Sequence, residues 1–262
     1  MTMVLIAIVA YALATAALSR RLREEQRRIP VFVWALAAVG ILAHIAAHAW
    51  TWHRAGGANL HIVSALSLVS IGMAALTLLV ALRGQMAALG MIVFPIAAAA
   101  ALGYGTLGRD DPSTLDWRLQ LHAWCALLAY ATLAISAVLA VLLWLQERAL
   151  RRREFHGWLR ALPPLIALET LLFRTIAAGF ALLTAALLSG VLFVDDLLAQ
   201  HLAHKTVFSA LSWLAFGGLL LGRRLRGWRG TLAVRWTLVA MALLVLAYFG
   251  SNAVLELILK RR

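Results

Sequence analysis

Cysteine is almost missing from this sequence: Cys125 is the only one among 262 residues. An internal disulfide and a CxxC redox pair are therefore both excluded. Charge is scarce as well, because charged residues make up 13% of the chain whereas hydrophobic residues make up 63%. A soluble domain of this length has too much surface to bury so many apolar side chains. The composition therefore predicts a protein that lies in a membrane.

The apolar residues come in runs of about 20 residues, which is the length of a helix that crosses a bilayer. Only helices and closed barrels can cross, because every backbone polar group must be satisfied internally. The runs are rich in Ala, Leu and Val and lack the period-two alternation of barrel strands. We therefore predict an all-α fold, a polytopic membrane bundle of about eight transmembrane helices. The expected ranges are 2–18, 31–50, 61–83, 86–104, 120–145, 167–194, 204–222 and 233–258.

The net charge of +13 does not indicate a nucleic-acid partner. The arginines come in short bursts between the hydrophobic runs, mainly in the first, fifth and seventh connections. These connections share one side of the membrane, which the positive-inside rule assigns to the cytoplasm. Both termini are therefore predicted to be external, although the tail of residues 260–262 is basic. We expect a multi-pass protein of an energised membrane such as the bacterial inner membrane.

The sequence has no recognisable soluble domain, low-complexity linker or internal repeat, so we expect a single integral membrane domain over residues 1–262. The N-terminal run Met1–Ala17 lacks a preceding basic region and a clear cleavage site, and we expect it to be a retained helix. We also find no nucleophile–base pair, phosphate-binding loop or carboxylate pair placed for hydrolysis. The protein is therefore not expected to be an enzyme.

Seven of the eight histidines fall on the external half of the predicted topology. His44 and His48 are four residues apart, which places them on one face of the second expected helix. His122 opens the fifth helix and His204 precedes the seventh. An imidazole inside hydrocarbon is costly without a partner, so such histidines suggest a functional site, the alternative being a packed, hydrogen-bonded histidine. The histidines expected to be ordinary interfacial residues are His53, His61, His156 and His201.

Haem suits these histidines better than zinc does. Zinc usually takes Cys or carboxylate ligands as well, and no such residues accompany His44 and His48. Haem takes one or two axial imidazoles in an apolar, aromatic slot. Tryptophans that could form such a slot occur along the chain, although the belt at the membrane interface is the alternative for each. The residues therefore permit a haem site without proving one.

The segment 162–190, LPPLIALETLLFRTIAAGFALLTAALLSG, carries the strongest resemblance to a known family. It resembles the pattern L-P-x-L-x-x-L-[DE]-x-L-x-[FY]-R-x-I-x-x-G-F-x-L-L-T-x-x-x-x-x-G of the membrane-integral cytochrome c assembly family, the CcsA- and CcmC-like haem-handling proteins. Three further segments are similar to family segments: LHAWCALLAYATLAISAVLAVLLWLQ, HKTVFSALSWLAFGGLLLGRRLRGWRG and AYFGSN. The resemblance is strongest over residues 40–258, and the short chain is most similar to the HemX/YpjD-type branch.

The resemblance implies a haem-handling protein with histidine ligands to the iron of a non-covalent, b-type haem. His44 matches a ligand position inside the membrane, and His122 matches one on the external side. Arg174, in the sixth helix, would bind a haem propionate or a partner subunit. The alternative for Arg174 is a snorkelling arginine with Glu169 as its counter-ion.

The chain departs from the family pattern in its external segment and in its histidine pairs. Family members carry a Trp-rich segment, W-G-x-[YW]-W-x-W-D, where this chain has VDDLLAQHLA. The usual partner of His44 falls on Leu221 or Gly222, and that of His122 falls in ELILKRR, which has no histidine. We therefore predict that His204 replaces the lost partner of His122 on the iron. Its alternative role is that of a helix cap or a contact with lipid headgroups.

These observations predict a haem-binding integral membrane protein that assists cytochrome c-type assembly, or delivers or exports haem across the inner membrane. Its expected partners are haem, the lipid bilayer and other membrane or cytochrome-assembly subunits. One alternative is an accessory or regulatory membrane protein that has lost haem and acts through protein contacts. A second alternative is a small-solute transporter, which the absence of inverted repeats and paired broken helices disfavours.

Overall fold

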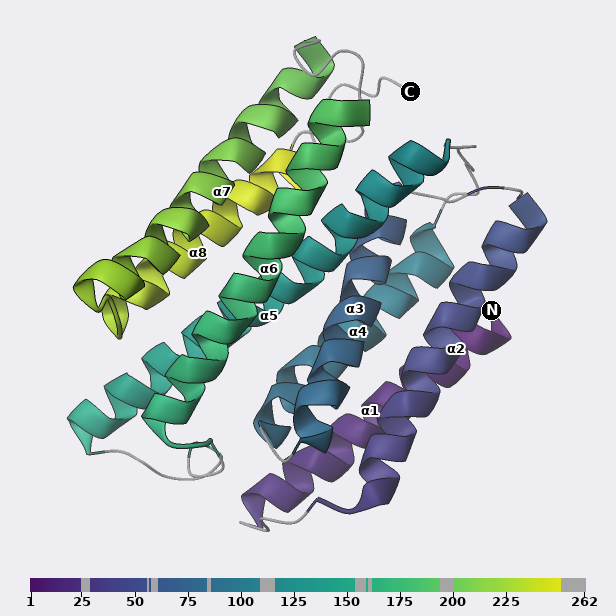
Figure 1. Ribbon diagram of the computed structural model, residues 1–262. Helices are drawn as coiled ribbons and strands as arrows, with labels where there is room; N and C mark the ends of the chain where they lie inside the picture. Colours follow the sequence, from purple (N-terminus) through teal and green to yellow (C-terminus); the bar gives the residue numbers. More distant parts are fainter. Residues whose placement is uncertain are drawn as a thin grey trace. The chain divides into compact units, whose positions relative to one another are not determined.

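The computed structural model describes residues 1–24, 29–55, 57, 61–83, 86–108, 116–153, 159, 162–193 and 200–250, without the side chains of 55, 200–204, 249 and 250. Over this part of the chain the regular structure is helical, and no strand occurs in it. The helices are α1 (Thr2–Arg23), α2 (Val31–Ala55), α3 (Ile62–Leu82), α4 (Ala87–Leu107), α5 (Trp117–Arg152), α6 (Leu165–Phe193), α7 (Gln200–Arg226) and α8 (Thr231–Val245), followed by the π-helix η2 (Leu246–Gly250) (Figure 1).

Eight helices in the described part of the chain are long and apolar enough to cross a membrane. Large apolar side chains are exposed along each of them, for example Leu42 on α2, Leu128 on α5 and Leu188 on α6. Exposure of this kind is unfavourable in water and natural in lipid. The predicted all-α membrane bundle of eight helices is thus confirmed, and the orientation of its termini stays a prediction.

The helix ends differ most from the sequence prediction at α5, which begins at Trp117 and continues to Arg152 instead of ending near residue 145. The extra turns contain Gln146, Glu147 and Arg148, which are good helix formers but interrupt the hydrophobic run. Hydropathy therefore marks where the apolar stretch ends and not where the helix ends. The predicted last helix, 233–258, extends beyond the described residues, which stop at 250.

The chain divides into two compact units. The first unit comprises Met1–Thr114 and Arg148–Leu168, and the second comprises Leu115–Glu147 and Glu169–Arg262. The first unit therefore contains α1 to α4, and the second contains most of α5 and α6 together with α7 and α8. The expectation that residues 1–262 act as a single membrane domain stays a prediction.

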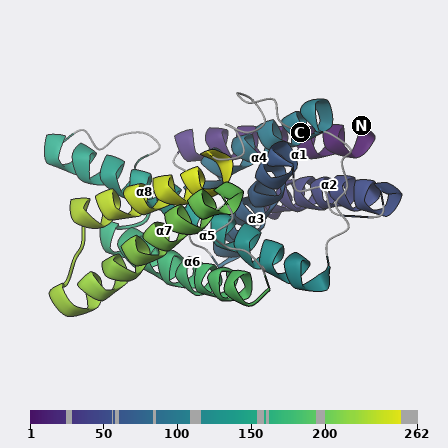
Figure 2. The same ribbon diagram turned by 90° about the horizontal axis from the view of Figure 1, so that it is seen from above.

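In the first unit, α1 packs against α2 and α4, and α3 packs against α2 and α4 (Figures 1 and 2). The interior between these helices is closed by fully buried side chains, among them Tyr11 and Leu18 on α1 and Leu89 and Phe94 on α4. The two rings stack, with 6.0 Å between the centroids of Tyr11 and Phe94. The four helices thus enclose one apolar core, in which any polar group needs a partner.

In the second unit, the family-like segment of α6 packs against α5 and α7. Gly179 allows the approach to α5, because a Cβ atom at this position would lie 2.6 Å from Cδ2 of Leu133. Toward α7, the ring of Phe180 stacks on that of Trp213, whose Nε1 donates a hydrogen bond of 2.8 Å to Oγ1 of Thr184. The small and aromatic residues of the segment are therefore explained by helix packing.

The last helices of the second unit are joined to the rest by side-chain hydrogen bonds to backbone carbonyls. α7 and α8 lie side by side (Figures 1 and 2), and Oγ of Ser212 donates to the carbonyl of Ala240 over 2.8 Å. The hydroxyl of Tyr130 on α5 donates to the carbonyl of Leu244, just before the π-helix begins. These contacts join α7 to α8 and α5 to the end of α8 within the second unit.

Candidate functional site

Two histidines of α2 meet at one serine inside the first unit. His44 is fully buried, and its Nε2 lies 2.7 Å from Oγ of Ser67 on α3. Nε2 of His48, one helical turn later, lies 2.9 Å from the same oxygen. A hydroxyl can donate one hydrogen bond and accept others, so Ser67 can satisfy both rings when at least one Nε2 carries a hydrogen. The serine therefore joins the two imidazoles across the interface of α2 and α3.

Aromatic side chains close around this histidine pair. The ring of Tyr11 meets His44 edge-on, with 6.1 Å between centroids, and the ring of Tyr104 stacks on His48 at 3.9 Å. The hydroxyl of Tyr104 donates to Oγ1 of Thr51 over 2.8 Å. Among the described residues, the Tyr11 hydroxyl and Nδ1 of His44 are buried with no hydrogen-bond partner. The centre is therefore densely packed, and these two polar atoms remain without a hydrogen-bond partner.

A cavity of about 510 Å³ opens at the ends of α1, α2 and α4. Its lining includes Trp50, Thr51 and Tyr104 but neither His44 nor His48. A haem in this cavity would thus have no direct access to the histidine pair. Together with the hydrogen bond between Ser67 and Nε2, the burial of His44 matches the alternative of a packed, hydrogen-bonded histidine. Iron ligation by His44 stays a prediction, and it would require Ser67 to be displaced.

His122 has a different environment in the second unit. It is half-buried, and its Nδ1 lies 2.9 Å from the carbonyl oxygen of Ala186 on α6 and 3.2 Å from Oγ of Ser189. A carbonyl oxygen only accepts, so Nδ1 must carry the hydrogen and Nε2 must hold the lone pair. Metal-ligating histidines are commonly oriented in this way by a backbone carbonyl. His122 therefore fits an axial haem ligand, whereas Nε2 of His44 is already engaged.

Gly190 lets the imidazole of His122 lie directly against α6. A Cβ atom at this position would be 3.2 Å from Cε1 and 3.4 Å from Nδ1 of the ring. The separation of 3.2 Å is shorter than ordinary van der Waals contact, so a larger residue would push the ring away from the Ala186 carbonyl. The last glycine of the family-like segment is thus explained by the position of His122.

Arg118 lies one helical turn before His122 on the same face of α5. Its guanidinium carbon is 5.6 Å from the ring centroid of Trp117 and 5.9 Å from that of Phe193. A cation held by two aromatic rings therefore lies beside the candidate ligand. Arg118 was not among the site residues predicted from the sequence, although its spacing of four residues from His122 places both on one face of the helix.

Arg174 is exposed on α6, and Glu169 is not its counter-ion. The carboxylate of Glu169, 4% exposed, accepts a hydrogen bond of 2.7 Å from Nη1 of Arg223 and lies 3.5 Å from Nη2 of Arg229. The expected alternative of a Glu169–Arg174 pair is wrong, because residues five apart point about 140° away from each other around a helix. The guanidinium of Arg223 also lies 3.8 Å from the ring centroid of Phe173. Glu169 therefore ties α6 to the end of α7 and the segment after it.

The other predicted histidines are only partly described. His53 is exposed at the end of α2, as expected of an interfacial residue. The side chains of His201 and His204, and all of His156, lie outside the described residues. The pairing of His122 with His204 therefore stays a prediction. Within the described residues, no group of three or more His, Cys, Asp or Glu side chains is placed to hold a metal ion.

Comparison with known proteins relates the chain to a family over most of its length. The family described as "Cytochrome C assembly protein" matches residues 33–259. The chain is 29% identical to "Inner membrane protein YpjD" of Escherichia coli (strain K12) over 265 residues, covering 97% of this chain and 98% of that protein. It is 33% identical over 165 residues to "Uncharacterized 28.8 kDa protein in nifR3-like 5'region" of Azospirillum brasilense, covering 60% of each.

A more distant similarity is to "Cytochrome c biogenesis protein CcsA" of Chlamydomonas reinhardtii, with 25% identity over 145 residues. This match covers 54% of the present chain and 39% of that protein. No solved structure matches the chain. The match of the family over residues 33–259 agrees with the eight membrane-spanning helices and the packing of segment 162–190. This multi-pass membrane protein therefore belongs to the cytochrome c assembly protein family.

Proposed function

We propose that this protein takes part in cytochrome c biogenesis in a bacterial inner membrane, as a haem-binding protein that helps to deliver or export haem. Family membership supports the role in biogenesis, and the similarity over almost the full length to an inner membrane protein supports the location. The observation that carries haem binding is the hydrogen bond from Nδ1 of His122 to Ala186, which leaves Nε2 as the nitrogen with a free lone pair.

In this proposal, Nε2 of His122 would hold the iron of a b-type haem, and the haem would supply the iron centre. Ala186 and Ser189 hold the imidazole from the side of α6, and Gly190 provides the space for it. The binding is non-covalent, since the thioether attachment of c-type haem needs a C-x-x-C-H motif and Cys125 is the only cysteine. The protein has no turnover chemistry of its own.

Arg118 is the residue best placed to bind a haem propionate. It lies about 6 Å along the helix axis from His122, on the same face and toward the external end of α5. A bidentate arginine–carboxylate pair would orient the haem with its polar edge toward water. Arg174 remains the candidate that the family resemblance suggests, but it lies on α6 sixteen residues before Gly190, toward the other end of that helix.

His204 is proposed as the second histidine that would hold the haem iron. α7 begins at Gln200, so His204 lies in its first turns, on the external side in the predicted topology. Replacement by methionine tests this role, because an axial thioether in place of an imidazole shifts the haem spectrum. His204→Met should shift it, whereas the matched control His201→Met should leave it unchanged.

Haem titration of the purified protein tests the function. The wild-type protein and the control His53→Ala should develop a Soret band that saturates, whereas His122→Ala should lose it. Arg118→Gln should weaken the binding of haem by about tenfold and leave the binding of haem dimethyl ester, which has no carboxylates, unchanged. Arg174→Gln tests the other candidate, and it should leave the binding of haem unchanged if Arg118 binds the propionate. Loss of the Soret band in His53→Ala to the same extent as in His122→Ala would reject the site.

One observation favours the haem-free alternative, an accessory protein that acts through protein contacts. His44 matches a family ligand position, yet it is fully buried and bonded to Ser67. A purified protein that stays colourless with ample haem, while still assembling with partner subunits, would support this second function.

A further inference from the structure

A groove of about 620 Å³ runs between α1 and α2, at the end where α1 stops and α2 starts. This end belongs to the cytoplasmic side in the predicted topology. The groove is lined by Leu13, Ala16, Ala17, Arg20, Arg21, Glu24, Phe32 and Leu36. It lies within the first unit and contains none of the residues assigned above to the haem site.

The shape of the groove follows from the spacing of residues on α1. Positions 13, 16, 17, 20, 21 and 24 recur at intervals of three and four and therefore form one stripe along the helix. Ala16 and Ala17 have short side chains, which leaves a hollow in the middle of the stripe. The hollow is walled by Leu13 on α1 and by Phe32 and Leu36 on α2. Its floor and walls are apolar.

Polarity changes sharply along the same groove. From Leu13 to Arg20 the helix rises by about 10 Å, and over this length the lining passes from apolar to basic. The connection that follows is basic too: residues 19–30 contain five arginines and two glutamates. An occupant with a negatively charged end and an apolar remainder would match this polarity.

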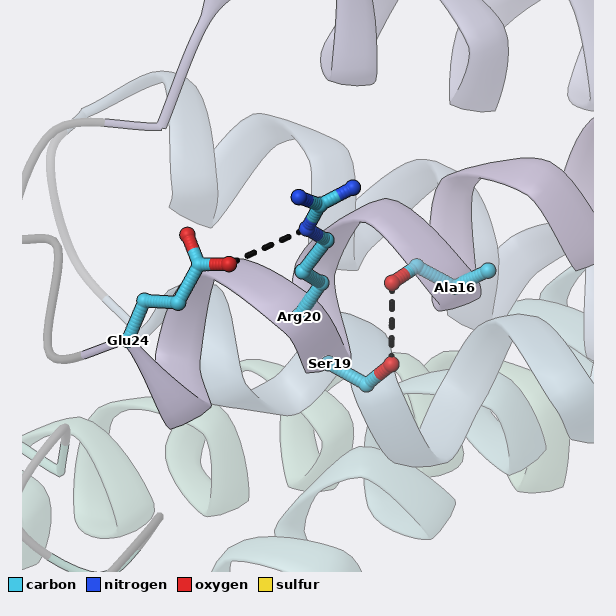
Figure 3. A network of polar contacts seen from close by, with 4 residues as sticks. All are labelled: Ala16, Ser19, Arg20 and Glu24. Carbon is cyan, nitrogen blue, oxygen red and sulfur yellow. Dashed lines mark hydrogen bonds and ion pairs between the residues drawn. The ribbon is translucent and has the colours of Figure 1, made fainter.

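Arg20 forms an ion pair with Glu24, the residue that follows α1. Its Nε donates a hydrogen bond of 3.0 Å to Oε1 of Glu24, and its two terminal nitrogens lie on the far side of Nε from Glu24 (Figure 3). The side chain of Arg20 is 82% exposed. The hydroxyl of Ser19 donates to the carbonyl of Ala16 and is already engaged (Figure 3). The terminal nitrogens of Arg20 are therefore donors that the groove offers to an anion.

We propose that this groove binds an anionic glycerophospholipid of the surrounding bilayer. The terminal nitrogens of Arg20 bind the phosphate, and one acyl chain lies over Ala16 and Ala17 between Leu13 and Phe32. A lipid with net negative charge is preferred over a zwitterionic one, because the basic connection attracts net charge at the membrane surface. This site is independent of haem.

Lipid retention, measured by native mass spectrometry of the full chain in mild detergent, tests the proposal. The probes are phosphatidylglycerol and phosphatidylcholine with the same acyl chains. We expect phosphatidylglycerol to be retained about fivefold to tenfold more than phosphatidylcholine. Arg20→Gln should reduce the retention of both lipids, because both carry the phosphate that Arg20 binds, and Arg20→Lys should keep most of the retention. Ala16→Leu, which fills the hollow, should reduce the retention of both lipids.

Two matched controls separate the groove from general effects. Arg83→Gln removes an exposed arginine at the end of α3, and Ala12→Leu enlarges an exposed alanine of α1 outside the groove. Both should retain lipid like the wild type, and circular dichroism should report the same helix content for all variants. Equal retention of the two lipids, or equal loss in Arg83→Gln and Arg20→Gln, would overturn the proposal. Competition by free glycerol 1-phosphate as strong as that by phosphatidylglycerol would overturn it as well, because it would reveal a simple anion site.

Discussion

The imidazole of His122 on α5 and the carbonyl of Ala186 on α6 are joined by a hydrogen bond of 2.9 Å. The bond fixes which ring nitrogen carries the hydrogen and leaves Nε2 as the basic nitrogen. The histidine matched by the family pattern on the external side is thus already oriented as a ligand, although Ala186 is 64 residues away in the chain.

Gly190→Ala should weaken haem binding by about tenfold, which is the usual effect of disturbing the residues that orient a ligand. The added Cβ would lie 3.2 Å from Cε1 of His122 and would push the ring by a few tenths of an ångström away from Ala186. Haem titration measures the effect. The control is Gly218→Ala, because a Cβ at Gly218 meets no atom within 4 Å. An unchanged affinity in Gly190→Ala would mean that the close approach of α6 does not matter for the ligand.

Ser67→Ala should destabilise the first unit by about 1–3 kcal/mol, because Nε2 of both His44 and His48 would lose its partner inside the core. For a chain of this size, the melting temperature should fall by about 2–4 °C per kcal/mol. Thermal unfolding in detergent measures the loss. Ser70→Ala is the matched control, since the Ser70 hydroxyl is buried on the same helix but bonds only to the backbone carbonyl of Ser67. Equal losses in the two variants would contradict the bridging role of Ser67.

Gly179→Ala should destabilise the second unit by about 1–3 kcal/mol through overpacking against α5. The new Cβ would lie 2.6 Å from Cδ2 of Leu133, and the adjoining Cγ is as close, at 2.7 Å. Gly218→Ala again serves as the control, and it should be neutral or stabilising because alanine favours helix by about 1 kcal/mol. Both effects appear in thermal unfolding. A neutral Gly179→Ala would show that α5 and α6 are packed less closely than described.

Glu169→Ala should destabilise the second unit by about 1–3 kcal/mol, since it leaves Arg223 without its anionic partner. The loss should stay below the 3–5 kcal/mol of fully buried pairs, because the side chain of Arg223 is 35% exposed and can reach water or headgroups. Arg174→Ala should have little effect on stability. A double-mutant cycle of Glu169→Gln and Arg223→Gln measures the coupling directly, and a coupling near zero would contradict the ion pair.

The predicted topology is tested by fusions to a reporter that fluoresces only in the cytoplasm. A fusion near residue 155 should be bright and a fusion at residue 262 should be dark, since arginines concentrate in the odd-numbered connections. A bright fusion at residue 262 would show that the C-terminus is cytoplasmic and that the prediction is wrong. The external placement of His122 would then have to be tested separately.

The sequence by itself determined the class of the protein and the number of its spanning helices. Insertion into a bilayer depends on the summed hydrophobicity of about 20 consecutive residues, and such a sum is a local property that can be read along the chain. It also revealed the resemblance of segment 162–190, together with His122 as a candidate ligand. It could not show where α5 ends, because good helix formers extend the helix past the hydrophobic run.

Only the tertiary structure decided the partners of the polar side chains. Proximity in the sequence suggested that Glu169 pairs with Arg174. In the structure the carboxylate of Glu169 pairs with Arg223, at the end of α7, and with Arg229, in the segment after it. The sequence predicted His44 as a ligand of haem iron, whereas in the structure its hydrogen-bond partner is Ser67 on the next helix. A buried polar group in an apolar bundle takes whichever donor or acceptor helix packing brings within about 3 Å, and packing depends on the shapes of residues far apart in the chain.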